Sequence, residues 1–143
     1  MDYNKYDLAY LKMASEWANL SYCKRRQVGA LIVKNRMIIS DGYNGTPAGS
    51  ENCCEDVEGK TYWHVLHAEA NAILKLAKST QSAEGATLYI TLSPCKDCSK
   101  LILQAGITRV VYIDEYSDTE GIDFLRRHHI ELLHIPDDKL LEK

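Results

Sequence analysis

Two short stretches, His67–Ala68–Glu69 and Pro94–Cys95–Lys96–Asp97–Cys98, decide how this chain folds and what it binds. A Zn²⁺ ion that does chemistry takes three protein ligands and keeps a fourth position for water. The two cysteines of the second stretch can coordinate one metal ion, and the histidine of the first stretch supplies a third ligand. A carboxylate beside the metal can then move protons. The predicted zinc ligands are His67, Cys95 and Cys98, and the predicted catalytic proton shuttle is Glu69.

Each half of this pattern has a simpler explanation when it is taken alone. A Cys-x-x-Cys between a strand and a helix is equally typical of a thioredoxin-type redox pair. A single histidine before a helix is usually a capping or surface residue. The conjunction of both halves, each at the expected start of a helix, favours the zinc site. Helix N-termini carry partial positive charge, which favours thiolates at the two cysteines.

Length and composition indicate one globular domain spanning residues 1–143, with 45% hydrophobic and 26% charged residues. No apolar run approaches the roughly 20 residues of a membrane span, so no membrane contact is expected. The formal charge of −3 disfavours binding of bulk nucleic acid. Five cysteines, two of them in a Cys-x-x-Cys, favour metal or redox chemistry over a disulfide framework. We therefore expect a cytoplasmic protein.

Strands and helices alternate after an opening hairpin, which predicts an α/β domain with a mixed sheet. An apolar stripe predicts a first helix over Tyr6–Leu20, with Tyr6, Tyr10, Met13, Trp17 and Leu20 on one face. The expected strands are Val28–Lys34, Met37–Asp41, Ala86–Leu92, Arg109–Ile113 and Ile130–Ile135. The further expected helices are His67–Lys78, Cys98–Ala105 and Asp118–His128, and Asp137–Lys143 is expected to fray.

Two loops offer contacts for a ligand. The basic run Lys24–Arg26 is either a solvated turn or a binding site for a phosphate group. Arg26 is the candidate for a 5′-phosphate, because a guanidinium fork matches phosphate geometry. The glycine-rich loop Gly42–Gly49 is either a plain surface loop or a loop that contacts a sugar or phosphate through Asn44 and Thr46.

The chain also resembles the deoxycytidylate (dCMP) deaminases over about residues 23–116. The motifs that carry the resemblance are His67–Ile73, Thr91–Cys95, Gln27–Gly29, Gly42–Pro47 and Leu101–Ile107. The resemblance implies the three-layer cytidine-deaminase-like fold, a five-stranded mixed sheet flanked by helices. It also implies zinc-dependent hydrolysis of dCMP to dUMP and ammonia, which feeds thymidylate synthesis. Relatives are homo-oligomers, often hexamers, and many respond to dCTP and dTTP as effectors.

Carried over to this sequence, the resemblance assigns substrate contacts residue by residue. Asn44 would contact the 3′-hydroxyl of the sugar, the Ser93 carbonyl would receive the exocyclic amine, and the Ala68 N–H would meet the base O2. Tyr116 matches an aromatic residue near the substrate, although a strand-end residue anchored in the surface explains it equally well.

Some features depart from the family or stay open. Lys78 stands where some relatives carry arginine, and the loop Cys54–Trp63 is shorter, which leaves effector control unsettled. Certain relatives hold a second, structural zinc. Cys23, Cys53 or Cys54, and His64 match that site in type, and three reduced thiols are the alternative. His128, His129 and His134 match no motif and are expected at the surface.

Two other function classes are open at this point. A nucleic-acid editing deaminase would need a basic surface and aromatic stacking positions. A regulatory nucleotide-binding module with a purely structural zinc would have no use for the carboxylate of Glu69. The net charge and the Tyr43–Gly45 sequence disfavour the first, and Glu69 itself disfavours the second.

Overall fold

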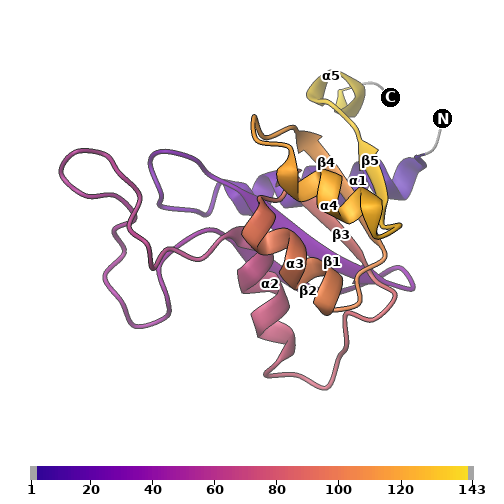
Figure 1. Cartoon of the computed structure of the whole chain (residues 1–143), viewed down its shortest axis with the longest axis horizontal. Helices are drawn as coiled ribbons and strands as arrows, with labels where there is room; N and C mark the ends of the chain where they lie inside the picture. Colours follow the sequence, from indigo (N-terminus) through magenta and orange to yellow (C-terminus); the bar gives the residue numbers. More distant parts are fainter. Residues whose placement is uncertain (1–2, 142–143) are drawn as a thin grey trace.

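The computed structural model describes residues 3–141 and contains one five-stranded sheet in the order β2-β1-β3-β4-β5 (Figure 1). The strands are β1 (Gly29–Lys34), β2 (Met37–Tyr43), β3 (Thr87–Leu92), β4 (Arg109–Asp114) and β5 (Glu131–His134). The helices are α1 (Lys5–Ala18), α2 (Ala68–Leu76), α3 (Lys96–Gln104), α4 (Glu120–Arg127) and α5 (Asp137–Leu140). The predicted five-stranded mixed sheet is confirmed.

Strand direction brings the ends of distant segments together. β1 pairs antiparallel with both β2 and β3, whereas β3, β4 and β5 pair parallel. Four strands therefore run in one direction and end at the same edge of the sheet. Because α2 follows β2 and α3 follows β3, both helices begin at that edge, where ligands bind in α/β sheets.

The two faces of the sheet carry separate apolar cores, which makes the domain three-layered. On one face, Ala30, Ile32, Leu88, Ile90 and Val110 pack with apolar residues of α2, α3 and α4. On the other face, Leu31, Val33, Tyr89, Val111 and Ile113 pack with Leu11 and Ala14 of α1 and Leu140 of α5. Alternation of neighbouring strand residues between the two cores follows from the period of two in a β-strand.

The predicted buried face of the first helix is wrong. The buried residues of α1 are Asp7, Leu11, Ala14 and Ala18, whereas Met13 is 38% exposed and Leu20, beyond the helix, is 56% exposed. The reason is the close approach of α1 to β1, where a side chain at Gly29 would collide with the Ala14 carbonyl oxygen. Only small residues fit where α1 crosses β1, and Ala14 and Ala18 occupy this position.

The C-terminal segment also differs from the prediction, because Asp137–Leu140 forms the short helix α5 and Leu140 is buried. Positions 142 and 143 of the expected frayed end lie outside the described residues. Within residues 3–141, no helix is both long enough and apolar enough to cross a membrane.

A mostly buried ion pair ties the first helix to the start of β4. Asp7 accepts hydrogen bonds from Arg109 Nη1 at 2.8 Å, Arg109 Nη2 at 3.0 Å and the Tyr89 hydroxyl at 2.6 Å. Burial acts to raise the pKa of Asp7, but the bonds from Arg109 and Tyr89 outweigh it, so the pKa lies below the usual 3.8. The carboxylate therefore stabilises the folded state wherever it is ionised.

Replacing Asp7 by asparagine is expected to lower the free energy of unfolding by about 3 kcal/mol, because it leaves a mostly buried arginine charge without its partner. The folded-state pKa of Asp7 is lowered, so its contribution is present above pH 3.8 and is lost as the pH falls through the folded value. Denaturant titrations between pH 3 and pH 7 would measure both effects. Glu131, whose side chain also bonds Arg109 but is 62% exposed, is the matched control. Glu131→Gln should cost less than about 1 kcal/mol, and an equal loss in both variants would contradict the account.

Candidate active site

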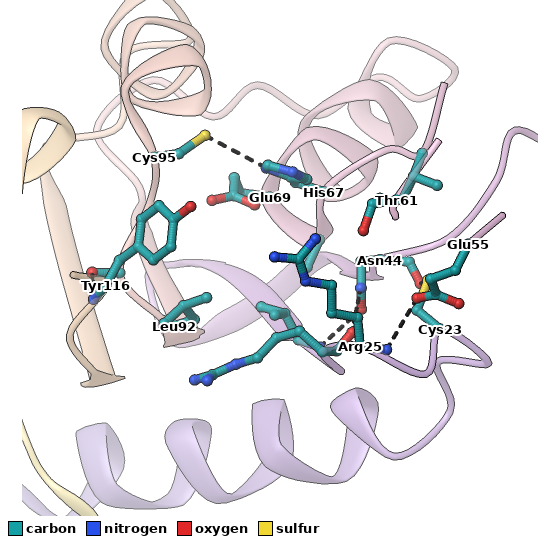
Figure 2. A pocket seen from close by; sticks show the side chains of 15 residues that line it. Cys23, Arg25, Asn44, Glu55, Thr61, His67, Glu69, Leu92, Cys95 and Tyr116 are labelled. Carbon is teal, nitrogen blue, oxygen red and sulfur yellow. Dashed lines mark hydrogen bonds between the residues drawn. The ribbon is translucent and has the colours of Figure 1, made fainter. Parts of the chain in front are cut away.

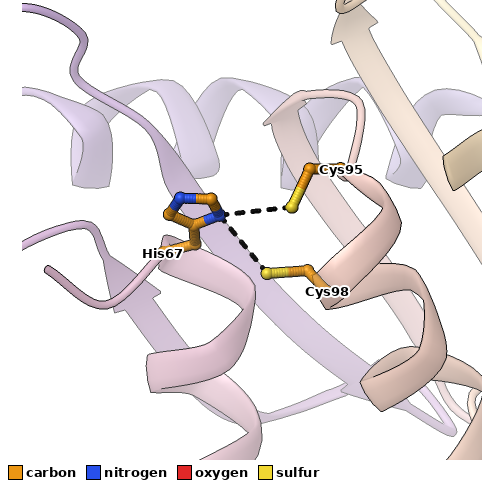
Figure 3. A group of neighbouring side chains, drawn as sticks. All are labelled: His67, Cys95 and Cys98. Atoms are coloured by element: carbon orange, nitrogen blue, oxygen red, sulfur yellow. Dashed lines mark hydrogen bonds between the residues drawn. The ribbon is translucent and has the colours of Figure 1, made fainter. Parts of the chain in front are cut away.

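The three predicted zinc ligands meet at the carboxyl edge of the sheet (Figure 3). His67 is the residue before α2, and Cys95 is the residue before α3. The sulfur atoms of Cys95 and Cys98 lie 3.5 and 3.4 Å from Nδ1 of His67. One ring nitrogen and two thiol sulfurs form a donor set that suits Zn²⁺ and leaves a position for water. The residues present therefore fit a catalytic zinc ion.

The three groups shift one another's proton affinities. Hydrogen bonds from Cys98 and from His67 lower the pKa of Cys95 to about 4, although burial opposes them. The pKa of Cys98 is raised, because its thiol bonds the Cys95 sulfur and is buried. The hydrogen bond to Cys95 raises the pKa of His67 against the effect of burial. Since metal ligands must be deprotonated, binding of zinc releases the protons that this trio shares.

Glu69 lies in the first turn of α2, and only 3% of its surface is exposed. Burial raises the pKa of its carboxyl group to about 7. In Figure 2 its carboxylate lies between Cys95 and His67 and faces the open pocket. A buried carboxyl group whose pKa is close to neutrality can both accept and return a proton, which is what the sequence predicted for this residue.

These residues form one end of a pocket of about 520 Å³, within the range of small-molecule sites. Figure 2 shows His67, Glu69 and Cys95 along one side, Tyr116 and Leu92 on a second, and Glu55 and Cys23 on a third. The lining residues are Cys23, Arg25, Arg26, Val28, Asn44, Glu55, Thr61, Val65, His67, Ala68, Glu69, Leu92, Ser93, Cys95 and Tyr116.

The basic loop before β1 forms another part of the pocket wall. Arg25 and Arg26 both line it, and Arg26 pairs with Asp114 at 3.2 Å. Asn44 is buried and holds this loop, because its amide nitrogen donates to the Arg26 carbonyl at 2.7 Å and its oxygen accepts from the Val28 N–H at 2.8 Å. The structure thus assigns Asn44 a role in shaping the basic loop.

Three further predicted contacts line the base end of the pocket. Ala68 is fully buried at the start of α2, where backbone N–H groups have no partner within the helix. The N–H of Ser93 donates to the Asp114 carbonyl at 2.8 Å, and its hydroxyl accepts from the Tyr116 N–H at 2.7 Å. Ser93 therefore anchors Tyr116, whose ring points into the pocket in Figure 2.

The structure does not bring every predicted residue to the site. Thr46 is not among the lining residues, because its hydroxyl bonds the Tyr22 hydroxyl at 2.6 Å and the Glu51 carbonyl at 2.9 Å. Glu55 and Thr61 also line the pocket, but no sequence pattern pointed to them, because a long irregular loop carries both. Arg25 belonged to the basic run but was not singled out.

The predicted second-zinc residues do not form one ligand set. Cys23 and Cys54 form a disulfide, which the composition did not favour, and the exposed Cys53 donates to the Glu55 carbonyl. His64 stacks on Tyr62 and lies outside the group of Cys23, Cys54 and Glu55 that could share an ion. The alternative prediction, that Cys23, Cys53 and Cys54 are all reduced, is wrong for Cys23 and Cys54. His128, His129 and His134 are exposed, as expected.

Comparison with known proteins agrees with this geometry. Residues 4–114 match the cytidine and deoxycytidylate deaminase zinc-binding region, and the chain belongs to this family. It is 36% identical to the deoxycytidylate deaminase of Enterobacteria phage T4, over 84% of each chain. It is 37% identical to that of Homo sapiens, over 83% of this chain and 71% of the human one. A crystal structure of dCMP deaminase from the cyanophage S-TIM5, in complex with dCMP and dUMP, has a TM-score of 0.90 and 46% identity, covering 94% of this chain and all of that one.

The segment that carries Cys95 packs tightly against backbone at Gly121. This residue lies in the first turn of α4, which packs against α3. A Cβ atom here would collide with the Pro94 carbonyl oxygen and would lie 2.6 Å from Ser99 Oγ and 2.7 Å from the Cys95 carbonyl carbon. The segment that carries the first cysteine ligand therefore packs directly on the backbone of α4.

Gly121→Ala is expected to lower the free energy of unfolding by about 1–3 kcal/mol, the usual effect of overpacking, and to weaken zinc binding by displacing Cys95. Ser99→Ala is the control, because the buried Ser99 hydroxyl has no hydrogen-bond partner within residues 3–141 and its removal leaves no orphaned group. Thermal unfolding and titration with a chromogenic zinc chelator would measure both. Unchanged zinc affinity in Gly121→Ala would show that this contact does not position the ligand.

Proposed function

We propose that this protein catalyses the hydrolytic deamination of dCMP, in which dCMP and water give dUMP and ammonia. The observation that carries the proposal is the buried carboxylate of Glu69 beside the His67–Cys95–Cys98 trio, in a pocket that two arginines also line. The phage T4, human and cyanophage proteins that this chain resembles are deoxycytidylate deaminases.

His67, Cys95 and Cys98 would hold the zinc ion, which would lower the pKa of a bound water molecule. Glu69 accepts the proton of that water and delivers it to the N3 atom of the cytosine ring as the oxygen adds to C4. Glu69 then carries the second proton to the exocyclic amine, which leaves as ammonia while the C4 carbonyl forms. Two thiolate ligands donate charge to the metal, so a carboxylate that takes up the proton of the water is useful here.

The base is held by groups at the carboxyl edge. The Ala68 N–H donates to the base O2, and the Ser93 carbonyl accepts a hydrogen bond from the exocyclic amine. Tyr116 covers the ring, and its position is supported by the bond from its N–H to Ser93. Asn44 contacts the sugar 3′-hydroxyl while it holds the basic loop. Arg26 pairs with the 5′-phosphate after it releases Asp114.

The assembly and regulation of the enzyme are part of the same proposal. We expect a cytoplasmic homo-oligomer, with a hexamer favoured, that supplies dUMP for thymidylate synthesis and is open to control by dCTP and dTTP. We expect one zinc per chain while Cys23 and Cys54 are joined. Their reduction frees two sulfurs close to Glu55, which together could hold a second zinc.

Glu69→Gln is expected to lower turnover of dCMP by at least 10²–10⁴-fold while the protein keeps its zinc, because Glu69 moves protons and binds no metal. Ammonia release from dCMP, CMP, cytidine and dCTP, with and without added dCTP or dTTP, measures activity and substrate range. Elemental analysis before and after reduction counts zinc in the same samples. Cys98→Ser is the control that loses metal and activity together. Loss of zinc in Glu69→Gln, or near-normal turnover, would contradict the assignment.

Arg26→Ala is expected to reduce kcat/KM for dCMP by about tenfold to a hundredfold, since a hydrogen bond to an ionised group is worth ~1.5–3 kcal/mol. Deoxycytidine has no phosphate and should be an equally poor substrate for both proteins. Lys24→Ala is the matched control, because Lys24 belongs to the same run but does not line the pocket. Arg25→Ala tests whether the neighbouring arginine shares the contact. Equal damage to dCMP and deoxycytidine would make Arg26 a structural residue.

A further inference from the structure

The outer end of the pocket holds a carboxylate where an anion would bind. Glu55 accepts hydrogen bonds from two successive backbone N–H groups, from Lys24 at 3.1 Å and from Arg25 at 3.0 Å. Figure 2 shows the bond from Arg25. Successive N–H groups that point to one spot form a concavity that binds phosphates and other anions. Glu55 fills this concavity with the protein's own negative charge.

The chain holds Glu55 in this position from both sides. Cys54 precedes Glu55 and Cys23 precedes Lys24, so the Cys23–Cys54 disulfide joins the two segments directly before they meet. On the other side, a β-bridge pairs Glu55 with Thr61, and the Tyr62 N–H donates to the Cys54 carbonyl at 2.8 Å. Glu55 is thus a fixed part of the pocket wall.

The charges at this end of the pocket are balanced. Arg25 and Arg26 both line the pocket, and a carboxylate contacts each residue, at the side chain of Arg26 and at the backbone of Arg25. Asp114 pairs with Arg26, and Glu55 is bonded to the backbone of Arg25. One phosphate group is matched by the two arginines. A second phosphate would meet the negative charge of Glu55, and the lining residues within 3–141 offer no further lysine or arginine.

We propose that Glu55 determines the specificity of this site for nucleoside monophosphates over di- and triphosphates, an inference that rests on the proposed deamination of dCMP. Glu55 acts in two ways. It occupies the backbone concavity that would otherwise take a second phosphate, and its charge repels the additional phosphate groups.

The test compares kcat/KM for dCMP and for dCDP in the wild type, in Glu55→Gln and in Glu51→Gln. Glu55→Gln keeps an oxygen that can accept one backbone bond but removes the charge. The preference for dCMP over dCDP is expected to fall about tenfold, equivalent to about 1.4 kcal/mol, through the KM of dCDP. Glu51→Gln removes a charge from the same loop at an exposed side chain that does not line the pocket, and should keep the wild-type preference.

The salt dependence of the preference for dCMP over dCDP distinguishes an effect of the Glu55 charge from an effect on the structure of the loop. Repulsion between exposed charges is screened as ionic strength rises. The wild-type preference should therefore fall at high salt, and the smaller preference of Glu55→Gln should change less. Calorimetric binding of dUMP and dUDP to the same proteins supplies a readout that does not depend on turnover, and it should show the same loss of discrimination.

The outcomes are distinguishable. A wild type that shows no ammonia release from dCMP contradicts the proposed function, and calorimetry then decides the role of Glu55 by itself. A wild type that is active on dCMP, with an unchanged preference in Glu55→Gln, overturns only the role of Glu55. Equal losses on both substrates, or loss of zinc in Glu55→Gln, would also overturn it, because Glu55 would then support the loop or bind metal.

Discussion

The candidate site depends on the common direction of four strands. β2, β3 and β4 end at one edge of the sheet, and the residues that follow them turn directly into the site. Asn44 follows β2, Ser93 follows β3 and Tyr116 follows β4. β1 runs the opposite way, so the basic loop before it reaches the same edge. Because all these segments end or begin at the same edge of the sheet, residues that lie far apart in the sequence meet there.

Two close backbone contacts lie next to the segments that carry the predicted zinc ligands. A side chain at Gly42 would lie 2.5 Å from the Ala68 carbonyl oxygen, so α2 rests directly on β2. Gly121 brings α4 equally close to the segment with Cys95. Because these contacts are between backbones, the ligands are positioned by rigid elements and not by flexible side chains. Both helices also direct their unpaired N–H groups toward the site, where partial positive charge stabilises thiolates.

Features that depend on local chemistry could be predicted from the sequence, and those that depend on distant partners could not. The zinc ligands were predictable because a metal requires particular residue types at the start of a helix. Asp7 resembled an ordinary residue of a first helical turn, and only Arg109, 102 positions later, gives it a buried partner. The buried face of α1 was predicted wrongly because the crossing at Gly29 admits only small residues. Which of two adjacent cysteines pairs with Cys23, and where Glu55 points, follow from the path of a loop that has no periodic pattern.

The two ends of the pocket are built by different physical rules. At the base end, Glu69 is almost fully buried, so its charge interacts strongly with its neighbours and its environment shifts its pKa. At the phosphate end, Arg26 and Asp114 each have 52% of the side chain exposed, so solvent weakens each single contact. If this end binds the phosphate as proposed, recognition depends on several charges that act together, and changing one of them should alter substrate preference more than the chemical step. On this proposal the rigid elements position the reacting groups, whereas the loops before β1 and between β2 and α2 select the nucleotide.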